Sequence, residues 1–192
     1  MLIFIIGLTL FLGVHSLRIV AESRRTQFIA QRGANAYKGL YTVVSLLGFG
    51  LLVWGYGLAR QQPTVLWVPP VAMKHVAALL TLIAFVMLAG AYVPGNAIKA
   101  KLHHPMTLAI KVWALAHLLS NGNLADVLLF GGFLAWAVFA FRAAKQRDRA
   151  AGTSYGGSTL SATLIAVVGG VVAWLVFALW LHGWLIGVRP FG

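Results

Sequence analysis

The chain of 192 residues contains no cysteine and only three carboxylates, and charged residues make up 9% of it. The lack of cysteine excludes disulfides, iron–sulfur clusters and thiolate-bound metals. Three carboxylates are too few for a di-metal site or a two-carboxylate hydrolase. Soluble domains carry about 25% charged residues, so this chain cannot cover a water-facing surface. With 60% hydrophobic residues and a mean hydropathy of +0.87, it is expected to lie in a bilayer.

Six apolar runs approach the length of about 20 residues that a transmembrane helix needs. They cover residues 2–20, 40–59, 71–93, 105–119, 124–141 and 160–188. The fourth run is short and carries Lys111 and His117, so the expected number of spans is five to six. The first run lacks the basic leader and cleavage pattern of a signal peptide and is expected to be retained. The sequence therefore predicts an all-α, polytopic integral membrane helix bundle with about six transmembrane helices, forming one domain over residues 1–192.

Basic residues outnumber acidic ones by 15 to 3, which gives a formal net charge of +12. They lie between the apolar runs, where they orient the chain and contact anionic headgroups, so nucleic acid is not an expected partner. Twelve of them fall in or beside the first, third and fifth connections; the other three are Arg60, Lys74 and Arg189. We expect a multi-pass protein of the inner (cytoplasmic) membrane, with the odd-numbered connections cytoplasmic and both termini outside. Residues 142–158 are expected to form a basic, glycine-rich cytoplasmic connection before the last helix.

Small residues inside the spans predict places where helices approach closely. These are Gly48, Gly50, Gly55 and Gly57 in the second run and Gly169 and Gly170 in the sixth.

Five of the six histidines lie in or at the ends of predicted spans, where ionisable groups are costly and mark functional sites. Depth along the spans separates an inner pair, His15 and His104, from an outer pair, His75 and His117. Thirteen residues separate His104 from His117, about 20 Å along a helix, so one iron cannot bind both. Two histidines on facing helices, with no thiolate available, are suited to haem b. For any single histidine, a hydrogen bond to a neighbouring backbone is an equally good interpretation.

Basic side chains near the inner surface are candidates for holding the haem propionates. Arg18 lies one turn beyond His15, and Lys111 lies two turns beyond His104 on the same helical face. The alternative is that these side chains only extend to the lipid headgroups.

The residues 103–133, HHPMTLAIKVWALAHLLSNGNLADVLLFGGF, follow a YVPGN segment, and HSLR occupies positions 15–18. These motifs resemble the NnrU family of bacterial membrane proteins and the related zeta-carotene isomerase, over about residues 1–145. For the isomerase, the resemblance implies a haem b held by two histidines, with an iron that becomes available to substrate on reduction. The histidine of the HS motif falls on His15, that of the HP motif on His104, and that of the AH motif on His117.

The chain departs from its relatives at two positions, with His103 in place of arginine and Ala109 in place of glycine. The resemblance implies a haem-b membrane protein that acts on an apolar small molecule, as a cis–trans isomerase if it is an enzyme. For the NnrU branch it implies support of nitrite and nitric oxide reduction in denitrification. One alternative is a non-catalytic accessory or assembly factor for a respiratory metalloenzyme. A membrane methyltransferase using S-adenosylmethionine is disfavoured, because the region where such enzymes carry an acidic motif has Asp148 as its single acid.

Overall fold

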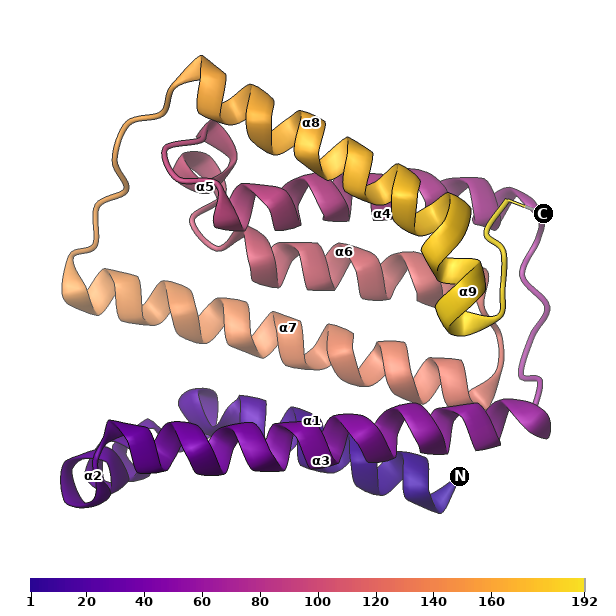
Figure 1. Ribbon diagram of the computed structural model, residues 1–192, viewed down its shortest axis with the longest axis horizontal. Helices are drawn as coiled ribbons and strands as arrows, with labels where there is room; N and C mark the ends of the chain where they lie inside the picture. The colour runs from indigo at the N-terminus through magenta and orange to yellow at the C-terminus, as the bar shows by residue number, and fades with distance from the viewer. Residues whose placement is uncertain (192) are drawn as a thin grey trace.

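The computed structural model describes residues 1–191 as helices that run side by side (Figure 1). The long helices are α1 (Leu2–Val20), α3 (Ala34–Gln61), α4 (Ala72–Tyr92), α6 (Pro105–Ser120), α7 (Leu124–Ala151) and α8 (Leu160–Val176). Two short helices, α2 (Glu22–Arg32) and α5 (Ala97–Leu102), lie in connections. A π-helical turn, η1 (Phe177–Leu181), and α9 (His182–Ile186) extend α8. Within the described residues, β pairing is limited to one isolated bridge between Val65 and Asn123.

Five of these elements are long and apolar enough to cross a membrane, namely α1, α3, α4, α7 and the continuous segment Leu160–Ile186. The sixth, α6, has 16 residues and is about 24 Å long at 1.5 Å per residue, less than the ~30 Å hydrocarbon core. Large apolar side chains remain exposed along the bundle, such as Leu46 (65%) and Trp180 (63%). The protein is therefore an all-α, multi-pass membrane protein, as its sequence predicts.

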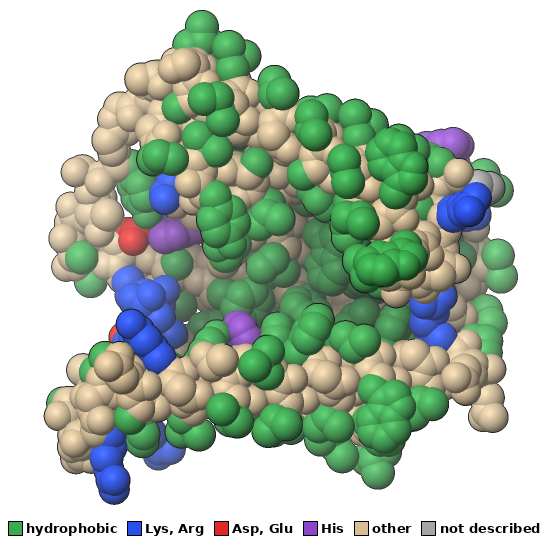
Figure 2. All heavy atoms as spheres, viewed as in Figure 1, with side chains coloured by type: hydrophobic (Ala, Val, Ile, Leu, Met, Phe, Trp, Pro, Cys, Tyr) green, Lys and Arg blue, Asp and Glu red, His purple; other side chains and the backbone are tan. Residues whose placement is uncertain are grey.

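The helices pack in the order α3, α1, α7, α6, α4, α8, each mainly against its neighbours in this row. The row is curved, and its two ends, α3 and α8, do not pack against each other within the described residues. Figure 2 shows the face between α3 and α8 to be hollowed, with apolar side chains along the hollow. One hydrogen bond crosses from α3 towards α9, where the guanidinium of Arg60 donates to the carbonyl of Ile186 (2.8 Å).

The bundle has two ends of different character. The basic end contains α2, α5, the start of α6 and the connection between α7 and α8, together with most of the lysines and arginines. The opposite end contains both termini and the tight turn before α7, where Leu66 and Trp67 donate backbone hydrogen bonds to the carbonyl of Gly122. The buried core cluster also lies towards the opposite end; it consists of Phe4, Leu52, Ala59, Ala114, Ala125, Leu129 and Phe130.

Two connections at the basic end contain more helix than the sequence indicates. The apolar run 124–141 continues without a break to Ala151, so the helix α7 includes the first ten residues of the predicted connection 142–158. It ends at Gly152, whose positive φ of 60° gives the left-handed cap common at helix C-termini. The first connection forms α2, a polar helix with no buried residue. An apolar run predicts the part of a helix that lies in lipid. It does not predict the polar turns of α7 and α2, which form helix outside the apolar runs.

Candidate functional site

His15 lies in the last third of α1, at the basic half of the bundle. Its Nδ1 is 2.7 Å from the carbonyl oxygen of Phe11, one turn earlier in the same helix. The imidazole centroid lies 4.3 Å from the ring of Phe11, 5.2 Å from Tyr41 on α3 and 6.2 Å from Trp136 on α7. Side chains and backbone from α1, α3 and α7 therefore hold the imidazole of His15 in its orientation. Within the described residues, Nε2 makes no hydrogen bond, so it is available to a ligand.

The ring of His15 lines a cleft of about 440 Å³ between α1, α2, α3 and α7. Its lining is Val14, His15, Arg18, Arg25, Tyr37, Lys38, Tyr41, Thr42 and Trp136. A second cleft of about 330 Å³, almost wholly apolar, shares Val14, Tyr37 and Tyr41 with it and extends along α1 and α3. The larger cleft thus joins an aromatic interior to three cationic side chains.

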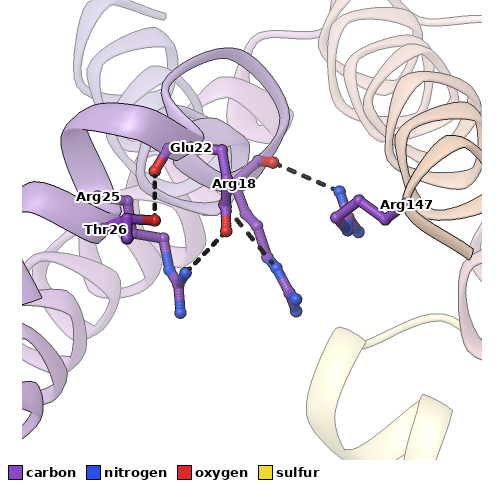
Figure 3. Close-up of polar contacts among 5 residues, drawn as sticks. All are labelled: Arg18, Glu22, Arg25, Thr26 and Arg147. Atoms are coloured by element: carbon purple, nitrogen blue, oxygen red, sulfur yellow. Dashed lines mark hydrogen bonds and ion pairs between the residues drawn. The ribbon is translucent and has the colours of Figure 1, made fainter. Parts of the chain in front are cut away.

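The cationic side of this cleft lies at the junction of α1 and α2 (Figure 3). Arg25 donates to the carboxylate of Glu22 at 3.0 Å, and Arg18 lies 3.9 Å from the same carboxylate. From α7, Arg147 donates to the backbone carbonyl of Arg18 at 3.5 Å. One carboxylate cannot neutralise three guanidinium groups, so this end of the cleft favours an anionic group.

Trp136 supplies a further polar group in the lining of the His15 cleft. Its indole Nε1 is buried and makes no hydrogen bond to any of the described residues. A buried donor without a partner is costly, but this nitrogen has almost no accessible surface and is not open to a molecule in the cleft as the side chains lie. The free Nε2 of His15, the aromatic lining and the arginines make the cleft a candidate site for a flat apolar ligand with anionic substituents, such as haem b.

His104 is placed at the start of α6 by an unusual turn. His103 has φ 65° and ψ −51°, and the amide of His104 donates to the carbonyl of Leu102 at 2.7 Å. This is a γ-turn with positive φ, a strained conformation for a residue other than glycine. Pro105 then begins α6, a position that suits its fixed φ and missing N–H.

The imidazole of His104 is already engaged by polar partners. Its Nε2 lies 2.6 Å from Oδ2 of Asp148, near the end of α7, and the hydroxyl of Tyr155 donates to the same oxygen at 2.7 Å. The Tyr155 ring stacks on His103 with centroids 4.1 Å apart. Burial, followed by the hydrogen bond to the carboxylate, raises the pKa of Tyr155 to about 12. The phenol therefore keeps its proton at neutral pH and acts as a donor.

Lys111 lies beside this cluster. Its Nζ is 5.0 Å from the centroid of the Phe141 ring, and Lys145 Nζ approaches the same ring at 5.7 Å. The Phe141 ring in turn lies edge-on to His104 at 6.1 Å. Lys111 and His104 thus approach the same phenylalanine ring, and Lys111 is not among the residues that line the His15 cleft.

The structure does not bring the rings of His15 and His104 into contact. His15 packs on Trp136 and His104 on Phe141; five residues of α7 separate these two contacts, about 7.5 Å along the helix. Both histidines lie at the basic half of the bundle, as the sequence predicts, and each contacts α7. Bis-histidine ligation by this pair remains a prediction, and it requires Nε2 of His104 to leave Asp148.

The predicted outer pair is also separate. His117 donates from Nδ1 to the carbonyl of Trp113 (2.8 Å) and stacks on Phe130 at 4.5 Å. His75 is exposed on the first turn of α4 and makes no aromatic or hydrogen-bond contact with the described residues. Within those residues, no group of three or more histidines and carboxylates is arranged to hold a metal ion.

Sequence reasoning missed Trp136, Asp148 and Tyr155 as site residues. For Asp148 the sequence does contain an indication, because Phe141, Lys145 and Asp148 follow the i, i+4, i+7 spacing of one helical face. That signal is visible only if α7 is known to continue beyond Phe141. No local pattern identifies Tyr155, which is brought to His104 by the course of the connection after α7.

The fold defines a polytopic membrane protein, and the cleft beside His15 is its candidate ligand site. The model of the NnrU protein family matches residues 3–190, and the chain belongs to that family. Comparison with curated proteins and with solved structures gave no match.

Proposed function

We propose that this protein is an integral membrane haem-b protein in which His15 supplies an axial ligand. The observation that carries the proposal is the His15 ring itself: its Nδ1 is bonded to the Phe11 carbonyl, its Nε2 has no partner among the described residues, and the residue lines a cleft with aromatic and cationic side chains. A carbonyl that accepts from the other ring nitrogen fixes the tautomer and the ring orientation of a metal-ligating histidine.

The residues around His15 have separate roles in this proposal. Tyr37, Tyr41 and Trp136 would supply aromatic packing for the macrocycle. Arg18 and Arg25 would hold the propionates, since Glu22 is the one carboxylate paired with them among the described residues. When bound, haem b supplies an iron that can act as a Lewis acid or exchange one electron. His104 is the candidate second ligand, with Lys111 beside it as a further cation.

The ligand acted upon is proposed to be an apolar small molecule that enters from the bilayer. The hollow between α3 and α8 and the apolar cleft that adjoins His15 support this class of ligand (Figure 2). We also propose a physiological link to nitrite and nitric oxide reduction, the role that the resemblance to the NnrU family implies.

Haem binding is tested by the absorption spectrum of protein purified in detergent from haem-replete cells. We expect a Soret band in the wild type, and a loss of at least about tenfold in bound haem for His15→Ala, since the axial bond is removed. His182→Ala is the matched control, because His182 lies at the opposite end and bonds to the carbonyl of Val188. A wild type without a Soret band, even after hemin is added, contradicts the proposal.

We further propose that the protein lies in the inner membrane with its basic end in the cytoplasm. Twelve of the 15 lysines and arginines belong to that end or its adjoining helix turns, and positively charged connections stay on the cytoplasmic side. An alkaline phosphatase fused to the C-terminus should be active, and a fluorescent protein fused to the connection between α7 and α8 should fold. The reverse pattern would place the basic end outside.

A further inference from the structure

The connection between α7 and α8, residues 152–159, is fixed to the basic end at three points. The amide of Thr153 donates to the carbonyl of Asp148 (2.9 Å), the amide of Thr159 donates to the carbonyl of Gly95 (2.9 Å), and Tyr155 lies between them. Tyr155 is half-buried, whereas the other residues of this segment are exposed. Glycines at 152, 156 and 157 flank it and have open space around them. A short, glycine-rich segment is thus held by backbone hydrogen bonds at its two ends and by one side chain, that of Tyr155, between them.

Tyr155 contacts His103, His104 and Asp148, which we call the His104 cluster. Its ring is parallel to that of His103, with an interplanar angle of 1°. Its hydroxyl donates to Asp148 Oδ2 and lies 3.4 Å from His104 Nε2. With Tyr155 in this position the side chains of His104 and Asp148 still keep 21% and 23% of their surface exposed, so Tyr155 covers them in part and water reaches the rest.

The strained turn at His103 gives Tyr155 a further role. A residue other than glycine keeps a positive φ only where its surroundings enforce it. Stacking of Tyr155 on the His103 ring supplies such an enforcement, and the same turn directs His104 towards Asp148. The turn, the carboxylate and the phenol therefore act together on one imidazole.

We propose that Asp148 and Tyr155 are positioning residues for His104, and that residues 152–159 form a latch that keeps His104 Nε2 bonded to Asp148. Opening the latch moves Tyr155 away, relaxes the turn at His103 and frees Nε2 for another partner. The inference rests on the proposed function only where it names that partner as the haem iron. The latch itself is tested without haem.

The latch is tested by the rate at which diethyl pyrocarbonate modifies each histidine of the full-length protein, mapped by mass spectrometry at one mildly alkaline pH. Tyr155→Ala should raise the rates at His103 and His104 about fivefold, the effect of losing one stabilising hydrogen bond and its stacking partner. His182, at the opposite end, is the internal standard, and Ser154→Ala is the matched control because its side chain is exposed and makes no hydrogen bond to the described residues.

A second variant separates the two contacts of Tyr155. Tyr155→Phe keeps the ring stacked on His103 and removes the hydroxyl that bonds to Asp148, so the rate should rise at His104 and stay near the wild-type value at His103. An unchanged rate at both histidines in Tyr155→Ala would overturn the latch. A rise that includes His182 would also overturn it, because the variant would then have loosened the whole bundle.

Whether the haem iron is the other partner of His104 is tested with Asp148→Ala, by measuring the spin state of bound hemin. If Asp148 competes for His104 Nε2, this variant should increase the low-spin, six-coordinate fraction by about fivefold, and the gain should vanish when His104→Ala is added. An unchanged spin state overturns the competition. If no variant binds hemin while Tyr155→Ala still raises the modification rates, the proposed function fails and the latch stands.

Discussion

Replacing Gly55 with alanine is expected to lower the free energy of unfolding of the bundle by about 3 kcal/mol. A Cβ at this position of α3 would lie 2.5 Å from the Cα of Phe4 and 2.8 Å from the carbonyl carbon of Ile3, both in α1. These are backbone atoms, which no side-chain rotation can move, so the two helices must separate. In a membrane, where packing rather than the hydrophobic effect joins helices, such a loss is not offset elsewhere.

The matched control is Gly57→Ala, two residues further along the same helix. No atom lies within 4 Å of a Cβ at Gly57, and alanine favours helix over glycine by up to about 1 kcal/mol. Titration with SDS in mixed micelles, followed by tryptophan fluorescence, measures both variants. Equal midpoints for the two variants would show that α1 and α3 are not packed closely at Gly55.

Replacing Tyr56 with phenylalanine is expected to cost about 2 kcal/mol, the range for a hydrogen bond to a charged partner. The hydroxyl of Tyr56 donates to Oδ1 of Asp126, which is only 4% exposed, and Asn123 Nδ2 donates to the other carboxylate oxygen at 3.0 Å. Without Tyr56, this buried carboxylate on the first turn of α7 retains one side-chain donor. The loss also weakens the attachment of α3 to α7, which contact each other little elsewhere.

Tyr92→Phe is the control for this variant, because Tyr92 is 73% exposed and its hydroxyl makes no hydrogen bond to the described residues. The same SDS titration measures both. A Tyr56→Phe variant as stable as Tyr92→Phe would mean that Asp126 is satisfied without the phenol.

The glycines show how much of the helix packing the sequence can predict. Composition and run length predict the membrane class and the spans, since the bilayer fixes the length of every apolar helix. Small residues predict close approach, and Gly55 and Gly170 do lie against the backbone of a neighbouring helix. Gly57 and Gly169, in the same predicted set, face open space. Helical periodicity separates these positions onto different faces, but only the tertiary arrangement decides which face meets a neighbour.

For the candidate site, too, the sequence predicts one part of the arrangement and leaves another part to the tertiary structure. Depth arguments place His15 and His104 at the basic half of the bundle, and they cannot give the rotation of each helix about its own axis. That rotation directs His15 to a cleft with Tyr41 and Trp136, and His104 to Asp148. The contact with Tyr155 depends on a connection without regular structure, whose course follows from glycine conformations and not from any apolar pattern.

The central claim is that His15 binds haem iron through Nε2, and chemical rescue tests it most directly. His15→Gly removes the ligand and leaves space for a free imidazole in the cleft. The account predicts that the purified variant loses the wild-type Soret spectrum and that added imidazole restores it, while His182→Gly retains that spectrum throughout. A His15→Gly variant that keeps the wild-type spectrum, with no response to imidazole, would contradict the claim.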